Sequence, residues 1–236
     1  MSEKTENGKW KNKKAIVLLS GGLDSTTALY WAQSQGYQPY CLIFDYGQRH
    51  RREIESAEKI AKAKNFFYYI IRCELPWGGS ALLDKKAKLP KGRSHQEMTS
   101  GIPATYVPAR NILFLSFALS WAEAIGAETI VIGANQLDWS GYPDCREDFF
   151  KAFEKVIRQG TKMGVEGNAI QIVAPLLKKT KAEIVRLGSQ LGVPFEWTWS
   201  CYEGWEFPCG ACDSCLLREK GFEQAGVRDL SHAASH

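Results

Sequence analysis

The sequence predicts an α/β protein with a doubly wound, mostly parallel β-sheet and a C-terminal metal-binding helical segment. Apolar, strand-like runs alternate with helical segments along most of the chain, as expected for parallel strands joined by helical crossovers. A glycine-rich turn follows the first apolar run, and four cysteines lie between residues 201 and 215. In this architecture ligands bind beyond the carboxyl ends of the strands, so the glycine-rich turn marks the expected site.

The strands and helices are assigned from apolar runs and helical periodicity. The expected strands span residues 15–20, 40–45, 66–71, 129–133 and 169–173. The expected helices span residues 26–35, 51–64, 111–125, 148–159 and 180–191. Gly126 ends the third helix, and Thr180 with Glu183 forms a capping box at the start of the last. The segment 72–106 is long and irregular, which fits a functional lid and a disordered surface insertion equally well.

Composition indicates an ordinary globular protein. The chain has 236 residues, of which 44% are hydrophobic and 24% charged, so it can form a full core. Its net charge of +4 does not require a nucleic-acid partner, and no apolar run has membrane-spanning length. We expect a cytoplasmic protein with three parts: a polar, disordered extension over 1–14, an α/β core over 15–196, and a metal-binding segment with the C-terminal tail over 197–236.

The turn after the first strand has the composition of a phosphate-binding loop. Two glycines allow backbone N–H groups to approach an anion, and hydroxyl side chains follow where a helix begins. The sequence Ser-Gly-Gly-x-Asp-Ser resembles the pyrophosphate loop of enzymes that split ATP between its α and β phosphates. We therefore expect ATP to bind at Leu19, Ser20, Gly21, Gly22, Leu23, Asp24, Ser25, Thr26, Thr27, Ala28 and Leu29.

Within this loop, Asp24 and Ser25 are candidate catalytic residues. Asp24 is expected to help hold magnesium or to position the loop, although it could instead cap the helix. Neither the lysine-bearing phosphate loop of kinases nor a G-x-G-x-x-G motif occurs in the chain. Adenylation is therefore expected rather than phosphorylation.

Three further loops carry candidate ligand contacts. Arg110, the third candidate catalytic residue, opens a buried helix, where it could bind phosphate or carboxylate and could equally cap the helix or form a salt bridge. His50 is as compatible with a structural role as with a catalytic one. Mixed polar, charged and aromatic side chains after the second and fourth strands suit recognition of a heterocycle. The candidate substrate contacts are Asp45, Gln48, Arg49, Asp138, Tyr142, Asp144 and Arg146.

The four cysteines Cys201, Cys209, Cys212 and Cys215 have the spacing of a metal site. Two C-x-x-C steps share Cys212, and four thiolates complete the tetrahedron that zinc prefers, leaving no open position for catalysis. Buried thiols, disulfides and an iron–sulfur cluster are the alternatives. We expect one structural zinc ion per chain.

Five motifs in order carry a resemblance to a known family: SGGLDSTT, FDYGQRH, YVPARN, DWSGYPDCR and CYEGWEFPCGACDSC. Together they resemble the 7-cyano-7-deazaguanine synthases of the ATP-pyrophosphatase (PP-loop) superfamily, which have a Rossmann-like fold of the adenine nucleotide α-hydrolase type. The family is expected to have glycine where this chain has Ala109, so the residue type gives little support to a positive φ at that turn.

The resemblance implies a ligase of the queuosine pathway that converts 7-carboxy-7-deazaguanine and ammonia to the nitrile by successive adenylation of the acid and the amide. It also implies Mg²⁺ with ATP, and a homodimer with no required nucleic acid or membrane. Two other classes stay open: another adenylating enzyme of the superfamily, acting on tRNA or forming an amide, and a non-catalytic zinc-knuckle module that binds RNA.

Overall fold

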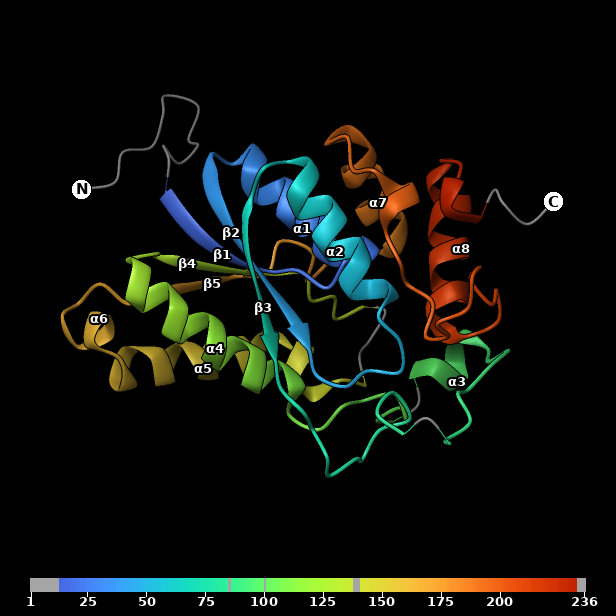
Figure 1. The fold of residues 1–236 in the computed structure, drawn as a ribbon, viewed down its shortest axis with the longest axis horizontal. Coiled ribbons are helices and arrows are strands. Elements are labelled where there is room, and N and C mark those ends of the chain that lie inside the picture. Colours follow the sequence, from blue (N-terminus) through green and yellow to red (C-terminus); the bar gives the residue numbers. More distant parts are fainter. Residues whose placement is uncertain (1–12, 85, 100, 138–140, 233–236) are drawn as a thin grey trace.

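The computed structural model describes residues 13–84, 86–99, 101–137 and 141–232. A five-stranded, fully parallel sheet in the order β3-β2-β1-β4-β5 forms the centre of the fold (Figure 1). The strands are β1 (Lys13–Leu18), β2 (Tyr37–Asp45), β3 (Phe67–Arg72), β4 (Thr129–Ile132) and β5 (Gln171–Val173). The chain adds strands outward from β1 to β3 and then returns to β4, so the strand order reverses between β1 and β4, where ligands bind in such sheets.

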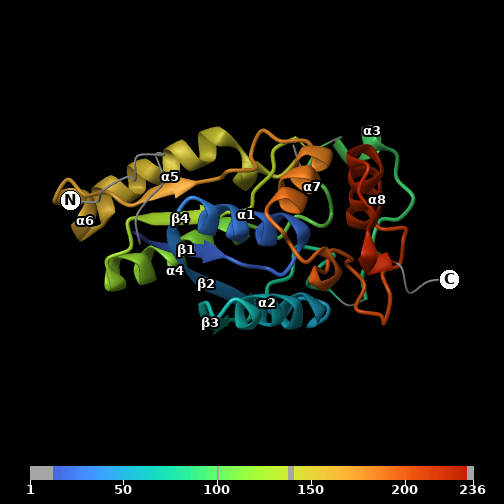
Figure 2. The same cartoon turned by 90° about the horizontal axis from the view of Figure 1, so that it is seen from above.

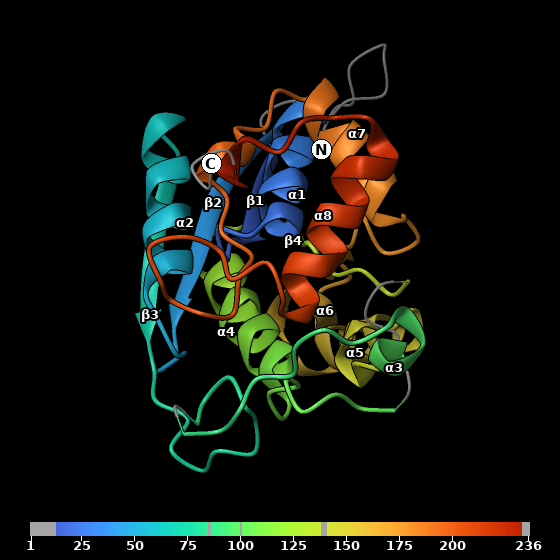
Figure 3. The same ribbon diagram turned by 90° about the vertical axis from the view of Figure 1, so that its right-hand side faces the viewer.

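Helices cover both faces of the sheet, which confirms the doubly wound prediction (Figures 1 and 3). One face carries α1 (Leu23–Ser34), α2 (Arg52–Ala63), α7 (Lys181–Gln190) and α8 (Asp213–Ala225). The other carries α4 (Arg110–Ile125) and α5 (Glu147–Gly160). The short elements are α3 (His95–Thr99), α6 (Lys162–Val165) and the 3₁₀ turns η1 (Pro143–Cys145), η2 (Phe195–Trp197) and η3 (Leu230–His232).

Burial on both faces explains why the strands read as continuous apolar runs. In β1, Ala15 and Val17 pack into the core on the α1 side, whereas Ile16 packs into the core on the α4 side. All three side chains are fully buried, as expected for a central strand of a parallel sheet. No helix in the described part of the chain is long and apolar enough to cross a membrane.

The segment 72–106 is packed against the fold where the structure describes it. Its residues Leu75, Leu89 and Met98 are buried, and it contains α3, a helix that the sequence did not predict. Its helix α3 lies with α8 at the end of the molecule opposite α6 (Figure 2). The prediction of a disordered surface insertion is therefore wrong for these residues. Element boundaries also shift, since β1 begins at Lys13 and α1 at Leu23, while residues 1–12 of the expected extension lie outside the described ranges.

The turn before α4 does have a positive φ, although its residue is alanine. Ala109 has φ 54° and ψ 22°, and its N–H donates to the Tyr106 hydroxyl at 3.0 Å. A left-handed conformation costs a side chain with a Cβ about 1–2 kcal/mol. The alanine at this position therefore does not prevent a positive φ, although the residue type gave little support to one.

We expect Ala109→Gly to raise the free energy of unfolding by about 0.5–1 kcal/mol, because glycine removes this strain at a smaller entropic cost. Urea denaturation measures the change. The control is Ala63→Gly at the exposed end of α2, which should lower stability by about 0.5–1 kcal/mol. Equal losses in both variants would contradict the assigned strain.

Candidate active site

A cavity of about 250 Å³ opens at the carboxyl ends of β1, β2 and β4, where the strand order reverses. Its wall also includes the first turns of α1, α2, α4 and α8, together with Trp199, Ser200 and Tyr202 beside the first cysteine of the cluster. The predicted site residues that line it are Leu19, Ser20, Gly22, Leu23, Asp24, Ser25, Gln48, Arg110 and Tyr142. The structure thus brings together the glycine loop and parts of all three neighbouring loops.

The glycine loop is a tight turn that ends at the start of α1. The Ser20 and Ser25 hydroxyl groups lie 2.9 Å apart, and the Ser25 hydroxyl accepts a hydrogen bond from the Ser20 N–H at 3.2 Å. Gly22 is the N-cap residue of α1 and has no side chain to occupy the free N–H groups of the first turn. These N–H groups and the positive end of the helix dipole form a site suited to phosphate.

Two close backbone contacts fix this loop in place. A Cβ at Gly21, where φ is +81°, would lie 2.3 Å from the Glu53 carbonyl oxygen and 2.6 Å from the Ala57 nitrogen. A Cβ at Gly133 would lie 2.8 Å from the Ser25 Cα. The loop is therefore held between the first turns of α2 and the end of β4.

Asp24 forms an ion pair that the sequence did not predict. Both its carboxylate oxygens accept hydrogen bonds from the Lys181 Nζ, at 2.9 and 2.8 Å, and Lys181 is buried at the start of α7. The helix-cap alternative for Asp24 is wrong, because Gly22 is the N-cap and no side chain caps this end of α1. The pair connects α7 to the phosphate loop and places a cation at the cavity wall.

The last residues of the predicted ATP segment lie in the helix interior. The Thr26 and Thr27 hydroxyls donate to the carbonyl oxygens of Gly22 and Leu23, at 2.7 and 2.8 Å. The expectation that they offer hydroxyl donors to a ligand is therefore wrong. Ala28 and Leu29 are fully buried in the core on the α1 side. Gly21 also lies outside the cavity lining, against α2.

Arg110 projects from the first turn of α4 toward the cavity. Its Nη1 donates to the Tyr46 hydroxyl at 3.4 Å, and its guanidinium lies over the rings of Tyr46 and Phe114 at 5.9 and 5.8 Å. Within the described ranges no carboxylate lies at ion-pair distance from it, so the salt-bridge alternative is not supported. Glu53 of α2 also lines the cavity, and burial raises its pKa to about 7 against the opposing charge of Arg110.

Gln48 and Tyr142 reach the cavity wall but already have hydrogen-bond partners. The Gln48 side chain accepts from the Tyr46 N–H at 2.8 Å and donates to the Phe44 carbonyl at 3.1 Å, which closes its own turn. The Tyr142 hydroxyl lies 2.8 Å from the Thr105 hydroxyl. Both residues therefore shape the wall as well as offering contacts to a ligand.

Asp45 and Arg49 do not line the cavity. Asp45 pairs with Arg51 at 3.4 Å. The Arg49 Nη1 donates to three backbone carbonyls within residues 81–87, at 2.9–3.0 Å, and so anchors the irregular segment to the loop after β2. Their predicted contacts with the substrate stay predictions, and the structure shows them with these partners instead of in the cavity lining.

The loop after β4 is only partly a cavity wall. Asp144 is buried and accepts a hydrogen bond from the Asn111 N–H at 3.1 Å, which fixes the start of α4. Arg146 is exposed as the N-cap residue of α5 and does not line the cavity. Burial raises the pKa of Cys145 to about 12, which disfavours the thiolate that a nucleophile requires. The predicted contact Asp138 lies outside the described residues.

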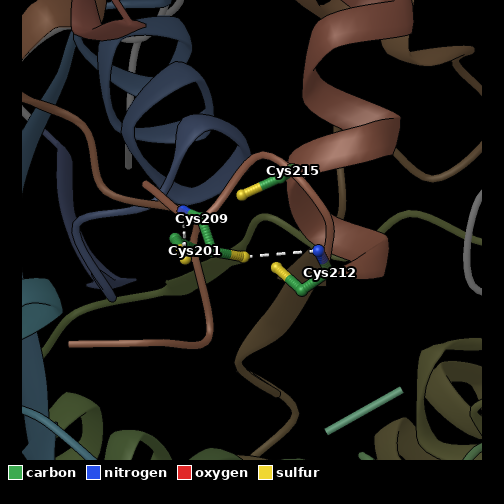
Figure 4. A group of neighbouring side chains, drawn as sticks. All are labelled: Cys201, Cys209, Cys212 and Cys215. Atoms are coloured by element: carbon green, nitrogen blue, oxygen red, sulfur yellow. Dashed lines mark hydrogen bonds between the residues drawn. The ribbon is translucent and has the colours of Figure 1, made fainter. Parts of the chain in front are cut away.

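The four cysteines of the C-terminal motif converge on one point (Figure 4). Their sulfur atoms all lie within 4.8 Å of one another, and all four cysteines are free, so the disulfide alternative is wrong. The Cys201 sulfur accepts hydrogen bonds from the N–H groups of Glu203 and Cys209, both at 3.3 Å, and the Cys209 sulfur accepts from the Cys212 N–H at 3.4 Å. This arrangement fits a metal held by four thiolates.

The cluster is joined to the cavity and to the irregular segment. The backbone N–H of Trp199 donates to the Gly21 carbonyl at 2.9 Å. This hydrogen bond connects the residues just before the cluster to the phosphate loop. His50 Nε2 lies 3.1 Å from the Cys201 carbonyl oxygen, a contact with the cluster backbone. From the other side, Arg93 forms an ion pair with the buried Asp213 of α8. A metal in the cluster would therefore stabilise one wall of the cavity.

We expect Asp24→Asn to lower the free energy of unfolding by about 2 kcal/mol and to slow AMP formation strongly, because it leaves the buried Lys181 ammonium without its anion. Urea denaturation and AMP release measure the two effects. The control is Glu147→Gln, which breaks more exposed ion pairs with Lys151 and Lys178 and should cost less than about 1 kcal/mol. Equal losses of stability in the two variants would show that burial of the Asp24–Lys181 ion pair does not increase its contribution to the free energy of unfolding.

The parallel sheet, the glycine loop after β1 and the cavity at the reversal of strand order define an α/β protein with a candidate phosphate-binding site. The chain belongs to the family described as "Queuosine biosynthesis protein QueC", whose sequence profile matches residues 14–226. It is 54% identical over 218 residues to a 7-cyano-7-deazaguanine synthase of Trichodesmium erythraeum, covering 92% of this chain and 98% of that protein.

Two solved structures share the fold at low sequence identity. The U34-tRNA thiolase NcsA from Methanococcus maripaludis, with its [4Fe-4S] cluster, is 14% identical, with a TM-score of 0.50 and coverage of 99% of this chain and 79% of that one. NMN synthetase from Francisella tularensis is 17% identical, with a TM-score of 0.50 and coverage of 96% and 86%. These likenesses support the fold alone.

Proposed function

We propose that the protein is an ATP-dependent ligase that converts 7-carboxy-7-deazaguanine and ammonia to 7-cyano-7-deazaguanine. The observation that carries the proposal is that the phosphate loop and Arg110 line one cavity, in a chain that belongs to the QueC family. The name of its relatives supplies the product. The proposal includes Mg²⁺ entering with ATP, free ammonia as the nitrogen donor, one zinc ion on the four cysteines, and a cytoplasmic homodimer.

The chemistry requires two molecules of ATP. A carboxylate has a poor leaving oxygen, so its oxygen attacks the α-phosphorus of ATP and pyrophosphate leaves. Ammonia then attacks the carboxyl carbon, and AMP leaves to give the amide. The amide oxygen is adenylated in the same way, and loss of the second AMP gives the nitrile. One cavity can serve both rounds because the same oxygen position is activated each time.

The residues of the cavity suit these steps. The free N–H groups at the start of α1 stabilise the leaving pyrophosphate, and Lys181 offsets the negative charge of the Asp24 carboxylate at the same end. The Arg110 guanidinium, which also lines the cavity, can bind the substrate carboxylate or the α-phosphate. A zinc ion held by four cysteines would have no open position and would support the fold only.

The test incubates the protein with ATP, Mg²⁺, ammonium and 7-carboxy-7-deazaguanine and follows nucleotides and heterocycle by mass spectrometry. AMP and pyrophosphate should form only when the carboxy-heterocycle is present. The free amide, offered with ATP, should give the nitrile without ammonia. ADP and phosphate as the sole nucleotide products would contradict the proposal, and a different acceptor that triggers pyrophosphate release would indicate another adenylating enzyme.

A further inference from the structure

Glu53 lies at the junction between the phosphate loop and Arg110. It belongs to the first turn of α2. Its backbone carbonyl oxygen is so close to Gly21 that a Cβ added there would lie 2.3 Å from it. Its side chain lines the cavity, where it feels the positive charge of Arg110 from α4. A carboxyl group is thus placed in the cavity beside the loop expected to hold the phosphates and near the charge of Arg110.

The carboxylate of Glu53 is unpaired, in contrast to the other acidic group of the cavity. Across residues 13–84, 86–99, 101–137 and 141–232, no hydrogen bond or ion pair to it occurs. Asp24 is bonded to Lys181 through both its oxygens. Arg218 of α8, also in the cavity wall, donates to Asp229 at 2.6 and 3.0 Å. Glu53 is therefore free to exchange a proton with a bound substrate.

The cysteine and tyrosine side chains of the described cavity wall are neutral at pH 7. Burial raises the pKa of Cys145 to about 12 and raises the pKa values of Tyr46, Tyr142 and Tyr202 above their usual value. Burial also raises the pKa of Glu53, to about 7. A carboxyl group with this pKa can accept and release protons near neutral pH, which is the property required of a general base.

We propose that the Glu53 carboxylate accepts the protons that leave the substrate nitrogen during amide formation and nitrile formation. This role rests on the proposed function. In amide formation, the nitrogen lone pair forms the C–N bond, Glu53 takes a proton from the nitrogen, and the C–O bond to AMP breaks with its electron pair leaving on AMP.

In nitrile formation the amide loses two protons from nitrogen. The first passes to Glu53 when the amide oxygen attacks the α-phosphorus of ATP and pyrophosphate departs. The second passes from nitrogen to Glu53 as the N–H electron pair becomes the third C–N bond and the C–O bond to AMP breaks. Glu53 returns each proton to solvent between steps, so the residue ends the cycle unchanged.

The decisive variant is Glu53→Gln, which keeps the shape of the side chain and cannot accept a proton. Two reactions are compared: exchange of labelled pyrophosphate into ATP with 7-carboxy-7-deazaguanine and no ammonia, and amide formation with ammonia. We expect exchange to change less than about threefold and amide formation to fall about 100-fold or more. Glu55→Gln, on the exposed side of the same helix turn, should leave both rates unchanged. Thermal unfolding checks that both variants are folded.

Equal losses of exchange and amide formation in Glu53→Gln would overturn the proposal, because Glu53 would then act on ATP binding or adenylation. Unchanged amide formation would overturn it as well. Absence of exchange in the unaltered protein would instead reject the proposed function.

A second measurement needs no variant. The rate of amide formation by the unaltered protein is followed against pH at constant free ammonia. It should fall as pH drops through about 7, where Glu53 becomes protonated, while pyrophosphate exchange should not. Parallel profiles for the two reactions would overturn the role of Glu53.

Discussion

Gly21→Ala is expected to lower the free energy of unfolding by more than about 3 kcal/mol and to abolish AMP formation. Two effects add at this position. The residue has φ +81°, which alanine adopts only with strain, and the new Cβ would lie 2.3 Å from the Glu53 carbonyl oxygen and 2.6 Å from the Ala57 nitrogen. Both contacts are with backbone atoms of α2, so relief requires the helix and the phosphate loop to move apart. Urea denaturation and AMP release measure the result.

The control for this variant separates strain from collision. Gly192 has a similar φ of +72°, but no atom lies within 4 Å of the position its Cβ would take. Gly192→Ala should therefore cost only about 1–2 kcal/mol and leave AMP formation intact. If both variants lose the same stability, the close approach of α2 to the loop has no energetic consequence.

The phosphate loop and the cysteine cluster were predictable because each is a local pattern. Gly21 and Gly22 stand between a strand and a helix, and the spacing of Cys209, Cys212 and Cys215 requires only that one turn bring sulfurs together. The parallel sheet was equally predictable, since Ala15–Leu18 and the later apolar runs alternate with helical periodicity. The element boundaries were less accurate, because strand and helix ends depend on tertiary contacts.

The residues that complete the site were not predictable, because they depend on contacts distant in sequence. Lys181 lies 157 positions from Asp24 and appears in the sequence only as part of a helix start. In the sequence, Glu53 is one of several charged residues of an amphipathic helix. Its position at the cavity follows from the packing of α2 against Gly21, which the sequence does not reveal. Arg49 shows the opposite case, since its loop was located correctly but its side chain binds the irregular segment instead of the cavity.

Cys212→Ser is expected to remove the metal and, with it, stability and activity together. Cys212 is fully buried and is the N-cap residue of α8, a position where serine is itself favourable, so the helix start is preserved and the effect reports on the metal. Three thiolates and a hydroxyl hold zinc poorly, because the metal prefers thiolate ligands in such sites. The segment around the cluster then loses the link that holds α8, whose residue Leu217 lines the cavity.

We expect zinc per chain to fall from one to near zero and the melting temperature to fall by about 10 °C. In a chain of this size, that shift corresponds to a loss of a few kcal/mol in the free energy of unfolding. AMP formation should fall together with the metal content. The matched control is Cys73→Ser, which alters a half-buried free cysteine that is not part of the cluster and should change none of the three. Metal analysis, thermal unfolding and turnover are measured on the same preparations. Stoichiometric zinc with an unchanged melting temperature in Cys212→Ser would contradict the assignment of this ligand. Bound iron with a brown colour in the unaltered protein would instead identify the four thiolates as the ligands of an iron–sulfur cluster.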